Sequence, residues 1–507
     1  MRLLTTRSFN VFLVLGLLLS LGPVAVSRAQ EATPAATPTT VAWEPCGEDA
    51  PGWECTTLSV PLDYADPNGS NIDLAVTRLP ASDPDQRIGT LLVNCGGPGC
   101  PTVTILHQLG GLIFSEEILA QFDLIGFDPR GVGESGQIDC QPDYEAYYAI
   151  DPSPDDQAEL DAWMAGGQAF ADACAANGGD LLPYLGTENV VSDMEQLRQA
   201  LGEETISFLG ISYGTSIGAR YADRYPDRVR AFALDSGLPT LADPATFVPE
   251  WVDALERSFD AYLADCAVSL TCPFHSDGNP GGAFDALMAQ VDATPLEVVT
   301  ESGTRLVGQR TILTAVDWGL SWSSRWPRLA AGLAAAAAGD GALVLQMADQ
   351  TQERLPDGTY GVGITSFVAV GCLDFDLPTD PAAYTELAAK AAQIAPRLGA
   401  YYVTWTLPCV YWSAPPTPAP HPPVAHGAPP ILVVGASLDT QDAYSWSVDM
   451  VGQLESGVLL RREGTWHPSY WNSACVAEAV NAYLLELALP DPSLICDSTG
   501  GSFIGIG

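Results

Sequence analysis

One stretch, residues 205–221, constrains the fold of this 507-residue chain more than any other. It begins as an apolar, β-branched run typical of a strand, passes through Gly210-Ile211-Ser212-Tyr213-Gly214, and continues with residues compatible with a helix. A serine at such a strand-to-helix turn is held clear of the sheet and can act as a nucleophile. Positions two before and two after the serine must be small, because their Cα atoms crowd the neighbouring elements. The sequences around Ser321, Ser437 and Ser502 lack the second glycine or the preceding strand.

The remaining strand-type runs alternate with helical segments. Apolar runs at 89–94, 122–127, 229–234 and 431–435 are separated by segments such as 187–201, whose apolar residues recur at helical spacing. This alternation predicts an α/β fold with a mostly parallel sheet covered by helices on both faces. Ligands bind such sheets at the carboxyl ends of the strands. Both Ser212 and the glycine-rich sequence after residue 94 follow strand ends of this kind.

The N-terminus predicts export. Arg2 and Arg7 precede an apolar run at 11–21, and Ser27-Arg28-Ala29 fits a cleavage site, so residues 1–29 are interpreted as a signal peptide. An uncleaved membrane anchor is the alternative. The protein is therefore expected to be secreted or to stay at the cell envelope. Residues 30–45 contain a Pro/Thr/Ala-rich run and are expected to form a disordered spacer.

The composition of the chain limits the classes of partner that the protein is expected to bind. A formal charge of −41 with a single lysine argues against nucleic acid or anionic lipid as a partner. No run after the signal peptide is apolar for long enough to cross a membrane, so no membrane association is expected once the signal peptide is cleaved.

Twelve cysteines in an exported chain indicate disulfides rather than metal sites. The spacing between cysteines favours pairing of sequence neighbours. The predicted pairs are Cys46–Cys55, Cys95–Cys100, Cys140–Cys174, Cys266–Cys272, Cys372–Cys409 and Cys475–Cys496. No CxxC or HExxH spacing is present, and neither a metal nor a cofactor is expected.

The order of the predicted strands and helices divides the chain into a core in two parts and an inserted lid. Residues 46–239 are predicted to form the first part of the α/β core. Residues 240–414 are tryptophan-rich and helical in tendency, and we interpret them as a lid inserted over the site. A proline-rich connection then leads into residues 415–507, the C-terminal part of the core.

A serine nucleophile needs a base and an acid that orients the base. His467 follows the last predicted core strand, whereas His107 precedes the serine and His275, His421 and His426 lie in the lid or the proline-rich return. Asp439 follows the strand at 431–435 and is the preferred acid, with Asp442 as its competitor. The resulting order of serine, acid and histidine is that of the α/β hydrolases.

An oxyanion hole needs two N–H donors aimed at the developing charge. The backbone N–H of Tyr213 follows the serine and is one candidate. The second is expected from Gly96-Gly97-Pro98-Gly99, where Pro98 has no N–H, so Gly97 is the choice and Gly99 the rival. This loop lacks the spacing of nucleotide-binding loops.

The chain resembles the secreted tripeptidyl aminopeptidases of the α/β-hydrolase superfamily, a family that also holds the prolyl aminopeptidases. The resemblance spans about residues 55–496 and rests on several short motifs. They are Val60-Pro61-Leu62-Asp63-Tyr64, Gly96-Gly97-Pro98-Gly99, Asp128-Pro129-Arg130-Gly131, Gly210-Ile211-Ser212-Tyr213-Gly214-Thr215, Trp326-Pro327-x-Leu329-Ala330 and Cys372-Leu373-Asp374. It implies Ser212, Asp439 and His467 as the catalytic triad, and Gly97 and Tyr213 as oxyanion donors. Cys100-Pro101 departs from the small residues usual after the glycine loop, and Trp466 stands where a glycine is commoner.

The resemblance implies an enzyme that releases tripeptides, other short peptides or single residues from peptides with a free N-terminus. Such an enzyme needs an acidic group for the substrate ammonium; Asp374 is one candidate, with a structural ion pair or helix cap as its alternative role. A carboxylesterase or lipase could use the same triad, and a non-catalytic binding protein could keep the fold. Because the base must be neutral, activity is expected to fall as the pH drops through roughly 6–7.

Overall fold

The computed structural model describes residues 41–239, 244–301, 303–417 and 420–497. The predicted signal peptide, residues 1–29, lies outside these ranges, as does the spacer up to residue 40. The last residues of the predicted spacer include the short strand β1. Within the described ranges, no helix combines the length and the apolar character that a membrane crossing requires.

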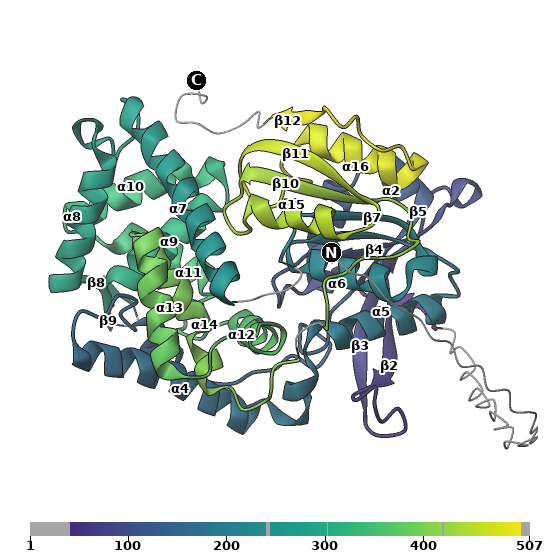
Figure 1. The fold of residues 1–507 in the computed structure, drawn as a ribbon, viewed down its shortest axis with the longest axis horizontal. Coiled ribbons are helices and arrows are strands. Elements are labelled where there is room, and N and C mark those ends of the chain that lie inside the picture. The colour runs from purple at the N-terminus through teal and green to yellow at the C-terminus, as the bar shows by residue number, and fades with distance from the viewer. Residues whose placement is uncertain (1–40, 240–243, 302, 418–419, 498–507) are drawn as a thin grey trace, which may run out of the picture. The chain divides into compact units, whose positions relative to one another are not determined.

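A ten-stranded sheet forms the core (Figure 1). In spatial order its strands are β1 (Glu44–Pro45), β2 (Glu54–Pro61), β3 (Asn71–Leu79), β5 (Phe122–Phe127), β4 (Gly89–Asn94), β6 (Ile206–Ile211), β7 (Val229–Asp235), β10 (Ile431–Leu438), β11 (Gly457–Thr465) and β12 (Ile495–Asp497). From β5 to β12 neighbouring strands run parallel, whereas the pairings among β1, β2, β3 and β5 are antiparallel. The predicted mostly parallel α/β fold is confirmed.

Helices cover both faces of this sheet, which is why its central strands are continuous apolar runs. Along β6, Phe208 packs in one buried cluster with residues of the helices on one face, and the next residue, Leu209, packs in another cluster with residues of the helices on the opposite face. The first face carries α5 (Thr187–Leu201), α6 (Tyr213–Arg224) and α15 (Tyr444–Gln453), and the second carries α1 (Thr102–Ile113), α2 (Glu116–Gln121) and α16 (Ala474–Glu486). The parallel strands therefore all point their carboxyl ends to one edge, where the loops that follow them meet.

A second, largely helical layer contains the predicted lid helices. Its members are α7 (Pro244–Val268), α8 (Pro280–Ala293), α9 (Gln309–Leu320), α10 (Trp326–Ala337), α11 (Ala342–Thr351), α12 (Gly363–Asp374), α13 (Pro381–Ile394) and α14 (Gly399–Thr406). This layer also contains a hairpin that was not predicted, β8 (Leu296–Thr300) paired with β9 (Gly303–Val307). The β-branched run Val298-Val299-Thr300, followed closely by Gly303, is the signal that could have identified this hairpin.

Two helices from an earlier part of the chain join the same layer. They are α3 (Tyr144–Tyr148) and α4 (Gln157–Asn177), and Figure 1 shows α4 among the lid helices. Trp163 of α4 is buried and donates a hydrogen bond from Nε1 to Oγ1 of Thr404, 3.0 Å away. Tyr147, Trp163 and Phe170 belong to the same buried cluster as the residues of α7 to α14. We call α3, α4 and α7 to α14 together the lid layer.

Disulfides link all twelve cysteines in the six predicted pairs. Three of them lie in the lid layer. Cys140–Cys174 holds α4, Cys266–Cys272 holds the end of α7, and Cys372–Cys409 joins α12 to the short helix η6 (Leu407–Tyr411). Disulfides at this density are typical of exported proteins.

A buried ion pair joins two of the sequence motifs. Arg130 has no exposed side-chain surface and donates from Nε and Nη2 to the carboxylate of Asp193, at 2.8 and 2.6 Å. Its Nη1 donates to the carbonyl of Leu62, and the hydroxyl of Tyr64 donates to Asp193. The Asp-Pro-Arg-Gly and Val-Pro-Leu-Asp-Tyr motifs therefore meet on α5 and stabilise the core.

Candidate active site

Ser212 occupies a strained turn between β6 and α6. Its φ and ψ of 52° and −116° lie in a region that non-glycine residues rarely adopt, and its N–H donates to the carbonyl of Asp235 at 2.8 Å. A Cβ at Gly210 would lie 2.5 Å from the carbonyl oxygen of Gly214, and a Cβ at Gly214 would lie 2.8 Å from Oδ1 of Asn94. Both flanking positions must therefore be glycine, as the elbow pattern requires.

Asp439 and His467 meet at the carboxyl ends of β10 and β11. Nδ1 of His467 lies 3.1 Å from Oδ1 and 3.3 Å from Oδ2 of Asp439. The Asp439 side chain is 2% exposed and that of His467 is 15% exposed. His467 and Ser212 line the same cavity, so the structure brings together all three residues that the sequence singled out.

The turn after β10 is organised by Asp439 itself. Oδ1 of Asp439 accepts the backbone N–H groups of Gln441 and Asp442, at 2.9 and 3.0 Å, and Oδ2 accepts the Ser236 hydroxyl at 2.8 Å. Burial alone would raise the pKa of Asp439, but His467 and the backbone N–H groups of Asp442 and Gln441 hold that pKa below its usual value. Asp439 is therefore held in one position and stays ionised.

His467 lies in a strongly negative environment. Burial alone would lower the pKa of His467, but Asp439, Asp442 and Asp235 together raise it to about 9. The imidazolium form is therefore stabilised well beyond that of a free histidine. This places the neutral, basic form at higher pH than the sequence analysis expected.

Asp442, the competitor for the acid, also faces the histidine. Its Oδ2 lies 3.8 Å from Nδ1 of His467, and its side chain is 6% exposed. Asp439 has the shorter, hydrogen-bonded contact, which supports it as the acid.

The glycine loop after β4 lies directly against the serine. A Cβ at Gly96 would lie 2.7 Å from the carbonyl oxygen of Ile211 and 3.1 Å from Cβ of Ser212. Gly97 lines the cavity with Ser212, whereas a Cβ at Gly99 would meet Gly363 of the lid layer. These contacts favour Gly97 over Gly99 as the second oxyanion donor.

The cavity over Ser212 has a volume of about 460 Å³ and a mostly aromatic wall. Its aromatic residues are Phe247, Trp251, Trp322, Phe367, Phe375, Trp405 and Trp446. All but Trp446 come from the lid layer, so the lid layer supplies most of the wall that a substrate would touch. A cavity of this size and composition suits a small organic ligand or a few amino-acid residues.

A second cavity of about 430 Å³ adjoins the first and shares Gly97, Pro98, Trp251, Phe367, Trp405 and Gln441 with it. Two carboxylates, those of Asp317 and Glu353, line this second cavity, and no lysine, arginine or histidine of the described residues does. Oδ1 of Asp317 accepts the Tyr402 hydroxyl at 2.6 Å and Nε2 of Gln441 at 3.1 Å. We call this the acidic cavity.

Sequence reasoning did not single out Asp317 or Glu353. It named Asp374 instead as a candidate for an ammonium site. Asp374 lines neither cavity; its carboxylate accepts the N–H of Thr187 at 2.9 Å and the Thr187 hydroxyl at 2.6 Å. Asp374 therefore caps α5, which was the alternative role.

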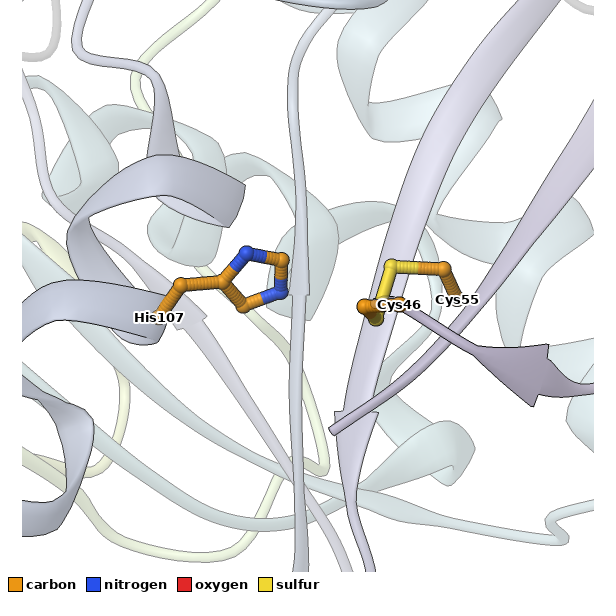
Figure 2. Close-up of side chains that lie close together, drawn as sticks. All are labelled: Cys46, Cys55 and His107. Atoms are coloured by element: carbon orange, nitrogen blue, oxygen red, sulfur yellow. A yellow bond between two sulfur atoms is a disulfide. The ribbon is translucent and has the colours of Figure 1, made fainter. Parts of the chain in front are cut away.

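One other cluster in the described chain has ligand atoms close enough for a metal: Cys46, Cys55 and His107. Figure 2 shows the bond between the two sulfur atoms, with the imidazole facing them. Neither cysteine can offer a thiolate while this disulfide is intact. Nε2 of His107 instead contacts the Thr77 hydroxyl at 2.8 Å.

Comparisons with known proteins agree with this geometry. Residues 91–277 match the family model described as alpha/beta hydrolase fold, and residues 395–496 match that described as TAP-like protein. The chain is 33% identical over 487 residues to serine protease Hip1 of Mycobacterium tuberculosis, covering 90% of this chain and 91% of that protein. It is 34% identical over 453 residues to carboxylesterase B of the same species, covering 87% and 86%.

Tripeptidyl aminopeptidase of Streptomyces coelicolor is 27% identical over 483 residues, covering 87% of this chain and 83% of that protein. These similarities extend over the sheet, the lid layer and the C-terminal strands alike. The chain belongs to the α/β-hydrolase family of serine hydrolases and peptidases that carry a TAP-like C-terminal region.

Proposed function

We propose that the protein is a serine aminopeptidase that releases short peptides, tripeptides in particular, from substrates with a free N-terminus. Ser212 is the nucleophile, His467 its general base and Asp439 the acid that orients His467. The hydrogen bond from Nδ1 of His467 to Asp439 supports these roles, because it leaves Nε2 free to accept the serine proton.

The reaction follows from these positions. His467 removes the Ser212 proton, the serine oxygen attacks the peptide carbonyl, and the negative charge on the carbonyl oxygen is stabilised by the N–H groups of Tyr213 and Gly97. His467, now protonated, donates its proton to the leaving amine, and an acyl-enzyme remains. Water then attacks the acyl-enzyme with His467 again as base, which releases the peptide and restores the serine.

The acidic cavity is the observation that supports a preference for substrates with a free N-terminus. A peptide ammonium is a cation, and this cavity presents Asp317 and Glu353 with no basic residue in its described lining. It adjoins Gly97, so a peptide with its scissile carbonyl near Ser212 could extend its N-terminus toward these carboxylates. Hydrogen bonds between ionised partners are stronger than neutral ones, which would favour free amines over blocked ones.

The relatives support the same assignment. Two of them are named serine protease and tripeptidyl aminopeptidase, and we extend peptide cleavage from them to this chain. The six disulfides and the predicted signal peptide support export to the medium or the cell envelope.

The test compares three substrates: a tripeptidyl anilide with a free amine, its N-acetylated twin, and a short-chain ester. The enzyme is expected to cleave the free-amine peptide well and the acetylated twin poorly. Ser212→Ala is expected to abolish cleavage of both peptides. Asp317→Asn should raise KM for the free-amine peptide about tenfold or more, because a charged hydrogen bond contributes roughly 1.5–3 kcal/mol. Glu386→Gln, an exposed charge on α13, is the matched control. Equal cleavage of the free and acetylated peptides would contradict the proposal.

The second candidate is a carboxylesterase with the same triad. The similarity to carboxylesterase B favours it, as does the aromatic wall of the cavity over Ser212. Turnover of the ester without cleavage of either peptide would identify this activity and leave the roles of Ser212, Asp439 and His467 unchanged.

A further inference from the structure

The mechanism above leaves one buried acid of the site unused. Asp442 lines the cavity with Ser212 and His467, and its Oδ2 has no hydrogen-bond partner within the described part of the chain. A buried carboxylate oxygen without a donor is costly and rare. Nδ1 of His467 lies 3.8 Å from this oxygen.

The backbone holds Asp442 in this position. Because Oδ1 of Asp439 accepts the N–H of Asp442, the loop folds back on itself after β10. Trp251 fixes the same loop by donating from Nε1 to the carbonyl of Gln441, 2.8 Å away. Both carboxylates are therefore presented to one imidazole by a single tight turn.

The charges around His467 do not balance. Asp439 and Asp442 face it from the loop after β10, and Asp235 from the end of β7. Two arginines of the described residues lie near these carboxylates: Arg462 of β11 is fully buried and acts on Asp235 and Asp439, and Arg325 lines the cavity with Asp442 and His467. With His467 neutral, three ionised carboxylates would face it, and protonation of His467 would offset part of their charge.

Asp442 titrates in the range where the enzyme would work. Burial, together with the charges of Asp439 and Asp235, raises the pKa of Asp442 to about 7, against the opposing effects of His467 and the Ser212 hydroxyl. As the pH rises past this value the second carboxylate becomes charged beside the base. His467 and Asp442 thus titrate as an interacting pair.

We propose that Asp442 is a positioning residue that acts through His467, sharing with Asp439 the stabilisation of the imidazolium that forms when Ser212 is deprotonated. The inference rests on the proposed roles of Ser212 and His467, and holds for peptide and ester substrates alike. The hydrogen bond to Asp439 orients the ring, and the charge of Asp442 strengthens the base.

The experiment measures the rate at which a fluorophosphonate probe labels Ser212 between pH 5 and pH 10, in the wild type and in Asp442→Asn. Removing the charge should move the acid limb of the profile down by about one pH unit, since a neighbouring charge shifts a pKa by roughly 1–3 units. The alkaline plateau should fall by up to about tenfold, because a weaker base accepts the serine proton less readily and one pKa unit corresponds to at most a factor of ten in rate. The two profiles should therefore converge at acid pH and separate at alkaline pH.

Asp449→Asn removes an equal charge from the exposed face of α15 and is the matched control, expected to keep the wild-type profile. A merely structural role for Asp442 would lower the labelling rate by the same factor at every pH, and that result would overturn the proposal. The proposal would also be overturned if the acid limb of the Asp442→Asn profile moved no further than that of Asp449→Asn. If Asp442→Asn does not fold, Asp442→Ser removes the same charge with a smaller side chain.

NMR titration of the His467 imidazole in the Ser212→Ala background separates this inference from the proposed function. If wild-type Ser212 does not react with the probe, the proposed nucleophile is wrong. Whatever the result with the probe, the pKa of His467 should be lower in the double variant Ser212→Ala/Asp442→Asn than in Ser212→Ala. An unchanged pKa overturns the inference.

Discussion

Nδ1 of His467 lies 3.1 Å from Oδ1 of Asp439, although the two residues are 28 positions apart in the chain. Parallel pairing of β10 with β11 brings them together, because both follow the carboxyl ends of adjacent strands. The same acid also fixes its own loop through two backbone N–H groups. Asp439 thus fixes the position of the imidazole, and it shares with Asp442 and Asp235 the effect that raises the pKa of His467.

Asp439→Asn should lower kcat by about 10³–10⁴-fold, because an amide can stabilise the wrong tautomer of His467. The fold should persist, since an amide fits the same space. Steady-state kinetics on a chromogenic substrate, with thermal unfolding as the check on folding, test this. A loss below tenfold would mean that Asp439 does not orient the base.

Activity should rise with pH along a limb that lies above pH 7. The neighbouring carboxylates raise the pKa of His467 to about 9, and only the neutral imidazole, which prevails above its pKa, can accept the serine proton. A profile of kcat/KM from pH 5 to pH 10 measures this limb. A limb at or below pH 6.5, the value of a free histidine, would contradict the electrostatic environment described above.

Loss of the Cys95–Cys100 disulfide should affect catalysis as well as stability. The bond closes the glycine loop that carries Gly97, and the double variant Cys95→Ala/Cys100→Ala should lower kcat roughly tenfold by loosening an oxyanion donor. Its stability should fall by about 2 kcal/mol, the value for a short loop. Cys266→Ala/Cys272→Ala opens a loop of nearly equal length in the lid layer and should lower stability alone. Equal effects of the two double variants on kcat would refute a role for the loop.

Gly97→Ala should abolish most activity. Gly97 has a φ of 101°, and its added Cβ would lie 2.6 Å from the amide nitrogen of Gly99, so the loop must move. Gly427→Ala is the control, because Gly427 has a φ of 78° and open space around it. Both variants carry a backbone cost of roughly 1–2 kcal/mol, but only the first should lower kcat. Comparable kcat values in the two variants would argue against Gly97 as a donor.

Arg130→Met should destabilise the fold by about 3–5 kcal/mol, because it leaves the buried Asp193 carboxylate without its partner. The double variant Arg130→Met/Asp193→Leu removes both charges and should recover much of that loss. Guanidinium unfolding of the wild type and the two variants gives the free energies. If the double variant is no more stable than Arg130→Met, the ion pair is not the source of the effect.

Local patterns predicted most of the residues that the structure brings together in the candidate site. The strand, elbow and helix around Ser212 are adjacent in sequence, and the elbow dictates its own glycines through steric contacts. Asp439 and His467 could be found because each follows a strand that is itself an apolar run. Neighbouring cysteines paired as predicted, because short loops bring them together readily.

The acidic cavity could not be found in this way. Asp317 lies on α9 and Glu353 follows α11, and the packing of these two helices against each other within the lid layer brings both residues to one cavity. No spacing rule connects such residues. The cap made by Asp374 on α5 is likewise a contact between segments 187 positions apart, so its role was open until the packing was known.

The lid layer is assembled from two stretches of chain with α5, β6, α6 and β7 between them, and this limits how its specificity can be exchanged. A chimaera that keeps α4 but takes residues 244–414 from a relative without a hydroxyl at the place of Thr404 would leave the N–H of Trp163 without its acceptor. An indole N–H left buried without its acceptor costs about 1–3 kcal/mol. Recombination between family members should therefore transfer residues 137–185 together with the later segment, and natural variation in the two stretches is expected to be correlated.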